Sequence, residues 1–146
     1  MGYKLASHMK VSLCTDALKM AIKNRKYPHQ KLIHHSDRGI QYCNPGYTEF
    51  VEQNGLSLSM TEQYDPYENA VAERINRTLK YEYGLKQQIK NTNLAKKIVK
   101  RAVNIYNNLR PHLSLGLLTP NQVHLNQNTN YKCYRRNKQN LQYLTI

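Results

Sequence analysis

Apolar side chains in the first part of the chain follow helical and strand spacing in turn. Residues 11–25 repeat apolar positions every three or four residues, which predicts an amphipathic helix. Residues 31–36 are short, apolar in the middle and soon followed by glycine, which indicates a buried strand. Asn44 and Pro45 are typical of a helix cap and first helical residue. Residues 56–60 alternate apolar side chains with serine, the period of a strand that buries one face.

The second part of the chain has mainly helical patterns. Asp65 and Pro66 predict another capped helix start, with Glu68 completing a capping box, and this helix is expected to run to about Gly84. The next helix is expected to begin from a cap at residues 91–92. Its predicted apolar face comprises Leu94, Ile98, Ala102, Ile105 and Leu109.

Strands that alternate with helices favour an α/β layer structure with a sheet. Two strands do not make a stable open sheet. Either a partner supplies strands, or the chain is a fragment, and residues 1–7 could provide the end of one more strand. We expect one domain in residues 1–125. Residues 126–146 are rich in Asn, Gln and basic side chains, which is typical of a poorly packed C-terminal extension.

Charge is unevenly distributed along the 146 residues. Residues 1–73 contain eight Lys or Arg and eight Asp or Glu, so they are neutral overall. Residues 74–146 contain fourteen Lys or Arg and one acid, Glu82, and therefore carry the whole formal charge of +13. General solubility rarely needs so uneven a balance. The basic half therefore indicates a polyanionic partner, with nucleic acid favoured.

Composition argues against several other classes of protein. Cys14, Cys43 and Cys133 are far apart and no Cys/His pair has zinc-site spacing, so free thiols in a reducing cytoplasm are expected. No run approaches the roughly 18 apolar residues of a membrane span. The N-terminal residues also lack the apolar stretch of a signal peptide. We therefore expect a cytoplasmic protein with no membrane partner.

Two carboxylates stand where they could share a metal ion. Asp37 follows the strand predicted at residues 31–36, and Glu73 lies early in the long helix. Such carboxylates can converge on Mg²⁺ together with water and phosphate oxygens. Each residue alone has an ordinary structural explanation. Asp37 lies in a turn sequence with Gly39, and an acid early in a helix complements the helix dipole.

Basic side chains share the helix face of Glu73. Arg77 and Lys80 follow Glu73 by four and seven residues, so all three project to one side, and Arg74 lies beside them. A carboxylate next to cations suits a metal site that also holds a phosphate backbone. The structural alternative is a surface ion pair between Glu73 and Arg77, worth roughly 0.3–0.5 kcal/mol.

Together these residues form a recognisable pattern. Between Asp37 and Glu73 lie 35 residues, a spacing similar to that of the second and third acids in the D,D(35)E triad of retroviral integrases and many insertion-sequence transposases. Residues 34–42 resemble the motif around the second acid, and residues 67–74 resemble the motif around the third. Lys80 matches the basic position typical of this group.

The resemblance extends over residues 2–125. Residues 106–112, followed by Thr119 and Pro120, resemble the closing motif of the same family. Thr119 and Pro120 are also expected to open a last short helical turn through Val123. The chain is most similar to the second-frame protein of DDE-type insertion sequences whose transposase is made from two overlapping reading frames.

The resemblance implies a ribonuclease H-like integrase core that cleaves DNA and transfers strands between transposon ends and target DNA. Asp37 and Glu73 would be the catalytic metal ligands for Mg²⁺ or Mn²⁺. Arg74, Arg77 and Lys80 would contact DNA.

The family's first acid has no counterpart in the sequence. It belongs to the first strand of the sheet, whereas no acid precedes Asp16, which falls inside the helix predicted at residues 11–25. By analogy, residues 2–5 match the end of the third strand. We therefore expect an incomplete fold that lacks the first strands, weak or absent metal binding, and a chain inactive alone. The alternative is a non-catalytic DNA-binding or assembly protein derived from a transposase.

An incomplete sheet would affect assembly. The strand at residues 31–36 would have a bare apolar edge, and the helix at residues 11–25 would lack part of the sheet on which it packs. We expect a homo-oligomer that buries one of these surfaces.

Overall fold

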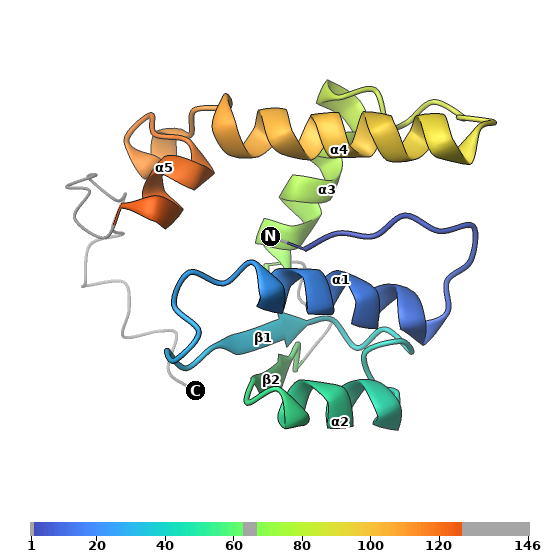
Figure 1. The fold of residues 1–146 in the computed structure, drawn as a ribbon, viewed down its shortest axis with the longest axis vertical. Helices are drawn as coiled ribbons and strands as arrows, with labels where there is room; N and C mark the ends of the chain where they lie inside the picture. Colours follow the sequence, from blue (N-terminus) through green and yellow to red (C-terminus); the bar gives the residue numbers. More distant parts are fainter. Residues whose placement is uncertain (1, 63–66, 127–146) are drawn as a thin grey trace. The chain divides into compact units, whose positions relative to one another are not determined.

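The computed structural model describes residues 2–62 and 67–126. The chain divides into two compact units, residues 1–99 and 100–146. No helix in the described ranges is both long enough and apolar enough to cross a membrane. In chain order the elements are α1 (Val11–Lys23), β1 (Ile33–Ser36), α2 (Pro45–Gln53), β2 (Ser57–Met60), α3 (Ala70–Glu82), α4 (Thr92–Asn108), a 3₁₀ turn (Leu113–Leu115) and α5 (Pro120–Leu125) (Figure 1).

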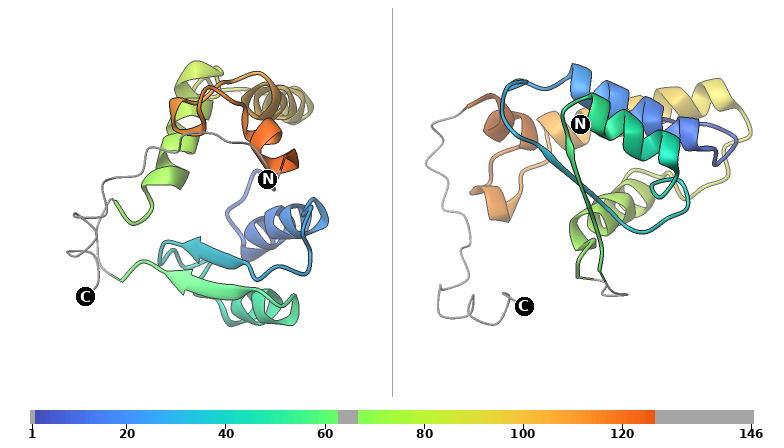
Figure 2. Two further views of the ribbon diagram at one scale, coloured as in Figure 1. Left: turned by 90° about the vertical axis from the view of Figure 1, so that its left-hand side faces the viewer. Right: turned by 90° about the horizontal axis from the view of Figure 1, so that it is seen from below.

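The sheet consists of β1 and β2, which run parallel and are joined through α2. The register pairs Ile33 with Ser57 and Ser36 with Met60. Figure 2 shows the two strands side by side, with α2 next to β2. Both strands were predicted, but β1 is not the buried strand that was expected, since Leu32 and Ile33 are exposed. Asn44 caps α2 as predicted, because its side chain accepts a hydrogen bond from the Gly46 backbone N–H.

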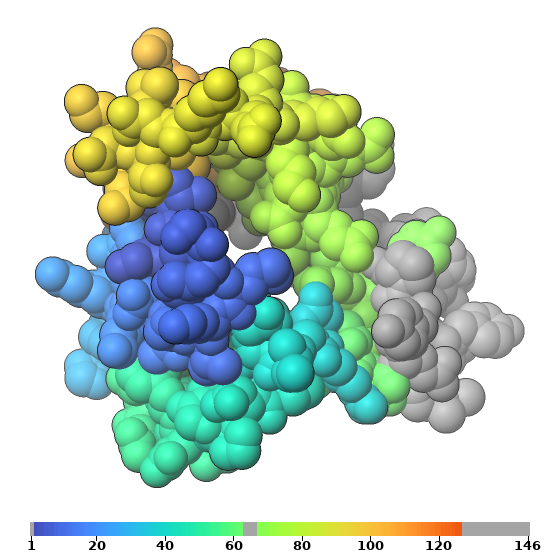
Figure 3. Space-filling view, turned by 90° about the vertical axis from the view of Figure 1, so that its right-hand side faces the viewer, coloured from blue at the N-terminus to red at the C-terminus, as the bar shows by residue number. Residues whose placement is uncertain are grey.

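A small apolar core joins α1, α2 and the sheet. Its buried members are Leu18, Tyr47, Val51 and Leu56. Val11, Cys14, Ala21 and Ile22 of α1 are partly buried against them. In the space-filling view α1 and the segment before it (blue) lie directly against α2 (blue-green) (Figure 3). Helix α2 and its neighbours therefore bury Leu18, whereas Val11, Cys14 and Ile22 stay partly exposed, so the expectation that this face needs another cover is met only in part.

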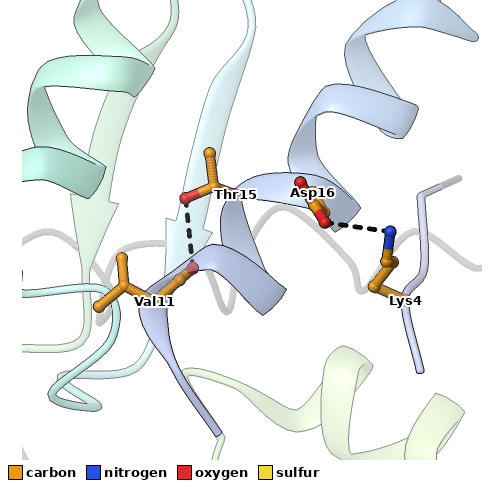
Figure 4. A network of polar contacts seen from close by, with 4 residues as sticks. All are labelled: Lys4, Val11, Thr15 and Asp16. Carbon is orange, nitrogen blue, oxygen red and sulfur yellow. Dashed lines mark hydrogen bonds and ion pairs between the residues drawn. The ribbon is translucent and has the colours of Figure 1, made fainter. Parts of the chain in front are cut away.

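The segment before α1 is not a strand. Residues 2–10 have no strand pairing, which corrects the prediction for residues 1–7 over the part that the structure describes. Lys4 instead forms an ion pair with Asp16 of α1, at 3.0 Å between Nζ and Oδ2 (Figure 4). A side chain at Gly2 would place its Cβ 1.9 Å from the Ala17 carbonyl oxygen. The segment therefore packs against the helix rather than against a sheet edge.

Helix α3 begins later than predicted. Residues 67–69 form a turn, and the helix starts at Ala70 without a side-chain cap from Asn69. The Glu68 carboxylate accepts a hydrogen bond from the Glu62 backbone N–H at 2.8 Å, so it ties the turn to the preceding segment. The predicted cap at Asp65 and Pro66 lies outside the described residues.

Helix α4 begins as predicted, but its buried face matches the predicted one only in part. The Asn91 side chain caps it by accepting hydrogen bonds from the backbone N–H groups of Asn93 and Leu94. Leu94 and Leu109, both assigned to the apolar face, are 51% and 69% exposed. The buried side chains are Ala95, Ala102, Val103 and Tyr106. Ala102 was predicted correctly and Ile98 and Ile105 are partly buried, so the buried face is shifted from the predicted one toward Ala95, Val103 and Tyr106.

The closing motif organises the turn after α4. The His112 backbone N–H donates to the Leu118 carbonyl at 3.1 Å, and the His112 ring meets the Tyr106 ring edge-on. Thr119 and Gln122 form a capping box that starts α5, as the Thr119-Pro120 pair predicted. The Asn121 side-chain amide then donates to the Asn108 side chain at 2.7 Å. These residues therefore hold the end of α4 and α5 together.

Candidate metal and DNA site

The end of the sheet fixes the backbone on both sides of Asp37. On one side, the Ser36 carbonyl accepts a hydrogen bond from the Thr61 N–H, which extends the parallel ladder one residue beyond β2. On the other side, the Arg38 Nε–H donates to the Thr61 carbonyl at 2.7 Å. Both backbone groups of Thr61 are thus engaged by the residues that flank Asp37. We call this arrangement the Thr61 clamp.

The carboxylate of Asp37 is oriented by Gly39. Its Oδ1 accepts a hydrogen bond from the Gly39 backbone N–H at 2.9 Å. A Cβ at Gly39 would also lie only 2.9 Å from that same oxygen, so a side chain there would displace the carboxylate. Asp37 is exposed, and its second oxygen makes no hydrogen bond within the described part of the chain. The Asp-Arg-Gly sequence therefore presents one oriented oxygen to an incoming ligand.

Glu73 and the predicted cations lie on α3. Glu73 is in the first turn, where its negative charge also complements the helix dipole. Arg74, Arg77 and Lys80 are exposed on the same helix. Among the described residues the Glu73 side chain has no ion pair or hydrogen bond, so the alternative of a surface pair with Arg77 is not formed. All four side chains are therefore available to an external ligand.

The donor set fits a hard divalent cation. Two carboxylates with unengaged oxygens are ligands that Mg²⁺ and Mn²⁺ accept together with water and phosphate oxygens. Within residues 2–62 and 67–126 no group of three or more His, Cys, Asp or Glu side chains forms a metal site. Asp37 and Glu73 belong to the same compact unit, but no hydrogen bond joins them, and their convergence on one ion remains a prediction.

The sequence did not reveal the polar cluster beneath β1. The Tyr47 hydroxyl, on α2, is 2.8 Å from His34 Nε2, and the ring of Tyr42 packs edge-on against both residues. Burial lowers the pKa of His34 and raises that of Tyr42 to about 12. The abundance of tyrosine was the only signal of such a cluster.

His34 and His35 cannot share a metal, as predicted from their adjacent places on a strand. His34 contacts α2 through Tyr47, whereas the Nδ1 atom of His35 is 3.0 Å from the Ser59 hydroxyl on β2. Their environments differ accordingly, since His34 is half-buried and His35 is exposed. Both histidines hold β1 in place next to Asp37. Cys14 and Cys43 are free thiols, and Cys133 lies outside the described residues.

The fold is that of a retroviral integrase catalytic core. The catalytic core domain of BIV integrase matches with a TM-score of 0.62 at 18% identity, over 84% of this chain and 75% of that one. A simian T-cell lymphotropic virus intasome structure matches with a TM-score of 0.67 at 16% identity, over 90% of this chain and 46% of that one. The predicted ribonuclease H-like α/β class is therefore confirmed.

Sequence comparison gives the family. Two family profiles, each described as an integrase core domain, match residues 1–66 and 54–120. The chain belongs to the integrase core family, in the form found in insertion-sequence transposases, as its motifs indicated.

Three bacterial relatives show the extent of the similarity. An insertion element IS600 31 kDa protein of Shigella sonnei is 37% identical over 119 residues, covering 81% of this chain and 43% of the relative. The transposase of IS629 from Shigella sonnei is 33% identical over 82% of this chain and 40% of its own length. Transposase InsF of IS3A from Escherichia coli K12 is 31% identical over 83% and 42%. The chain thus spans about two fifths of the length of these relatives.

Proposed function

We propose that this chain supplies the second and third carboxylates, Asp37 and Glu73, of a DDE transposase core that cleaves DNA and transfers strands. The single observation that carries the proposal is the built environment of Asp37. The Thr61 clamp fixes the backbone, Gly39 orients one oxygen, and the other oxygen is left for a ligand. An ordinary turn aspartate needs no such support from a residue, here Thr61, that lies 24 positions later in the sequence.

The chemistry follows from these side chains. Asp37 and Glu73 would each offer a carboxylate oxygen to Mg²⁺ or Mn²⁺. When bound, such ions activate an attacking oxygen and stabilise the leaving oxygen of a phosphodiester. Arg74, Arg77 and Lys80 would hold the phosphates of the DNA backbone near the two carboxylates.

Paramagnetic Mn²⁺ tests whether the two carboxylates converge. In an NMR titration of the chain, substoichiometric Mn²⁺ should broaden the amide signals around Asp37 and around Glu73 together. Asp37→Asn should abolish both effects, because one shared ion causes them. Glu49→Gln, which removes an exposed acid from α2, is the matched control and should change neither. Broadening near Glu73 that survives Asp37→Asn would contradict a shared site.

The expected partner is DNA, bound mainly through phosphates. The logarithm of the binding constant should fall by roughly 0.9 per neutralised phosphate for each unit of log salt. Lys80→Ala should reduce that slope by about 1, whereas Lys10→Ala, on the N-terminal side of α1, should leave it unchanged. Affinity independent of salt, or strong discrimination among unrelated duplexes, would refute phosphate-based binding.

We also propose that the chain forms homo-oligomers. Within the described residues β1 pairs with β2 alone, so its other edge carries unpaired backbone groups. Leu32 and Ile33 at this edge are 40% and 67% exposed, which makes the edge apolar as well. Light scattering at micromolar concentration should give at least a dimer, and Ile33→Lys should shift it toward a monomer. A monomeric wild-type chain would refute the proposal.

A further inference from the structure

Helix α4 has two chemically different sides. The buried side consists of small and apolar residues, namely Ala95, Ala102, Val103 and Tyr106. On the opposite side the sequence places exposed basic and amide side chains at helical spacing. We call this side the α4 basic face; its members are Asn93, Lys96, Lys97, Lys100, Arg101, Asn104 and Asn108.

The basic charges of this face have no partner among the residues that the structure describes. Helix α4 contains no acidic residue. Among the described residues, Lys96, Lys97, Lys100 and Arg101 form no ion pair and no side-chain hydrogen bond. Lys96 and Lys100, and likewise Lys97 and Arg101, are like charges four residues apart, an arrangement that weakens a helix. These like charges repel one another and do not stabilise the helix. Their arrangement therefore points to binding of an external anion.

The spacing of the cations suits a nucleic acid duplex. From Lys96 to Arg101 the helix advances about 7.5 Å at roughly 1.5 Å per residue. A DNA duplex carries one negative charge per roughly 1.7 Å of axis, or about four charges over the same length. The four cations therefore match the local phosphate density. The side-chain amides of Asn93 and Asn104 can donate further hydrogen bonds to phosphate oxygens, whereas the Asn108 amide already donates to Asn104.

An anionic membrane fits this helix less well. A helix that lies in a membrane interface inserts its apolar face among the lipids and keeps its cations at the headgroups. The apolar side of α4 is buried by the protein itself, so only the cations and amides are available. Phosphate groups on a rigid polyanion are therefore the better match.

We propose that the α4 basic face is a second DNA-backbone site, separate from the cations of α3 and from the carboxylates. This site rests on the proposed function, since it binds the same DNA at a second place. It would bind the duplex without sequence preference, because its members contact phosphates through positive charges and amide hydrogen-bond donors.

A matched pair of charge variants tests this site in the 146-residue chain. The α4 triple variant replaces Lys96, Lys97 and Lys100 with Gln. The control triple variant replaces three exposed lysines of the N-terminal part with Gln, and so changes the net charge equally; these lysines are Lys10, Lys23 and Lys31. Binding of a labelled duplex is followed by fluorescence anisotropy across a salt series. Circular dichroism checks that each variant is folded.

The salt slopes decide the outcome. The α4 triple variant should lower the slope of log K against log salt by about 2.7, at roughly 0.9 per phosphate, and the control triple by less than about 1. An equal decrease of the slope in the two triple variants would mean that only net charge matters, and would overturn the inference. Intact DNA binding by the α4 triple variant, with Lys80→Ala still weakening it, would overturn this site and leave the proposed function standing. Binding of anionic phospholipid vesicles that depends on the same lysines, without DNA binding, would also overturn it.

Discussion

Arg38→Ala tests the Thr61 clamp directly. The substitution removes the 2.7 Å hydrogen bond from the Arg38 Nε–H to the Thr61 carbonyl. Hydrogen bonds from charged donors contribute about 1.5–3 kcal/mol, but Arg38 is largely exposed and solvent screening lowers this value to about 1 kcal/mol. The loop that carries Asp37 should therefore open about fivefold more often.

Amide hydrogen exchange measures this opening. The Gly39 N–H, which donates to the Asp37 carboxylate, and the Thr61 N–H, which donates to Ser36, should both exchange about fivefold faster in Arg38→Ala. Arg38→Lys keeps the charge but loses the Nε donor, so both amide hydrogens should exchange as fast in this variant as in Arg38→Ala. The control Arg101→Ala, on α4, should leave both amides unchanged. Unchanged exchange at Gly39 in Arg38→Ala would refute the clamp.

Four further outcomes are expected. Gly39→Ala should leave the melting temperature within a few degrees but abolish the shared Mn²⁺ broadening, because its Cβ would lie 2.9 Å from the Asp37 oxygen. Val51→Ala should lower the free energy of unfolding by about 2 kcal/mol in a denaturant titration, since two methyl-sized groups of a fully buried side chain leave a cavity. The pKa of His34 is lowered by burial, so the unfolded chain binds more protons than the folded chain below about pH 6.5. The free energy of unfolding should therefore decrease as the pH falls below about 6.5. In thermal melts, the melting temperature of His34→Gln should fall less over this pH range than that of the wild-type chain. The chain alone should not cleave DNA with Mg²⁺ or Mn²⁺, because its sequence contains two of the three acids that the family uses; metal-dependent nicking that Asp37→Asn abolishes would contradict this.

The sequence alone determined the local features of the fold. Asn44 and Asn91 each cap a helix as predicted, and α5 opens at Thr119 and Pro120 as predicted, because a cap is a bond between residues two or three positions apart. The two strands were also recognisable, since their apolar pattern and flanking glycines are local. The spacing of Asp37 and Glu73 and the basic second half likewise gave the family, which the comparisons then confirmed.

The tertiary structure decided what depends on distant residues. Arg38 reaches the carbonyl of Thr61 only because parallel pairing of β1 and β2 brings together residues 23 positions apart. The same holds for the bond between His34 and Tyr47, which crosses from the strand to α2. No periodicity in the sequence encodes such a contact, because it exists only after the chain has folded.

The faces of the helices show the same division. Hydrophobic spacing predicted α1 and α4 as amphipathic helices, yet it placed Leu94 on the buried side of α4 and left α1 without a cover. Packing selects side chains by shape as well as by hydrophobicity, so Ala95 and Tyr106 are buried where leucines are not. The sequence thus indicates where α2, α4 and α5 start and that a helix has two sides, while the start of α3 and the side that each helix covers depend on the neighbouring elements.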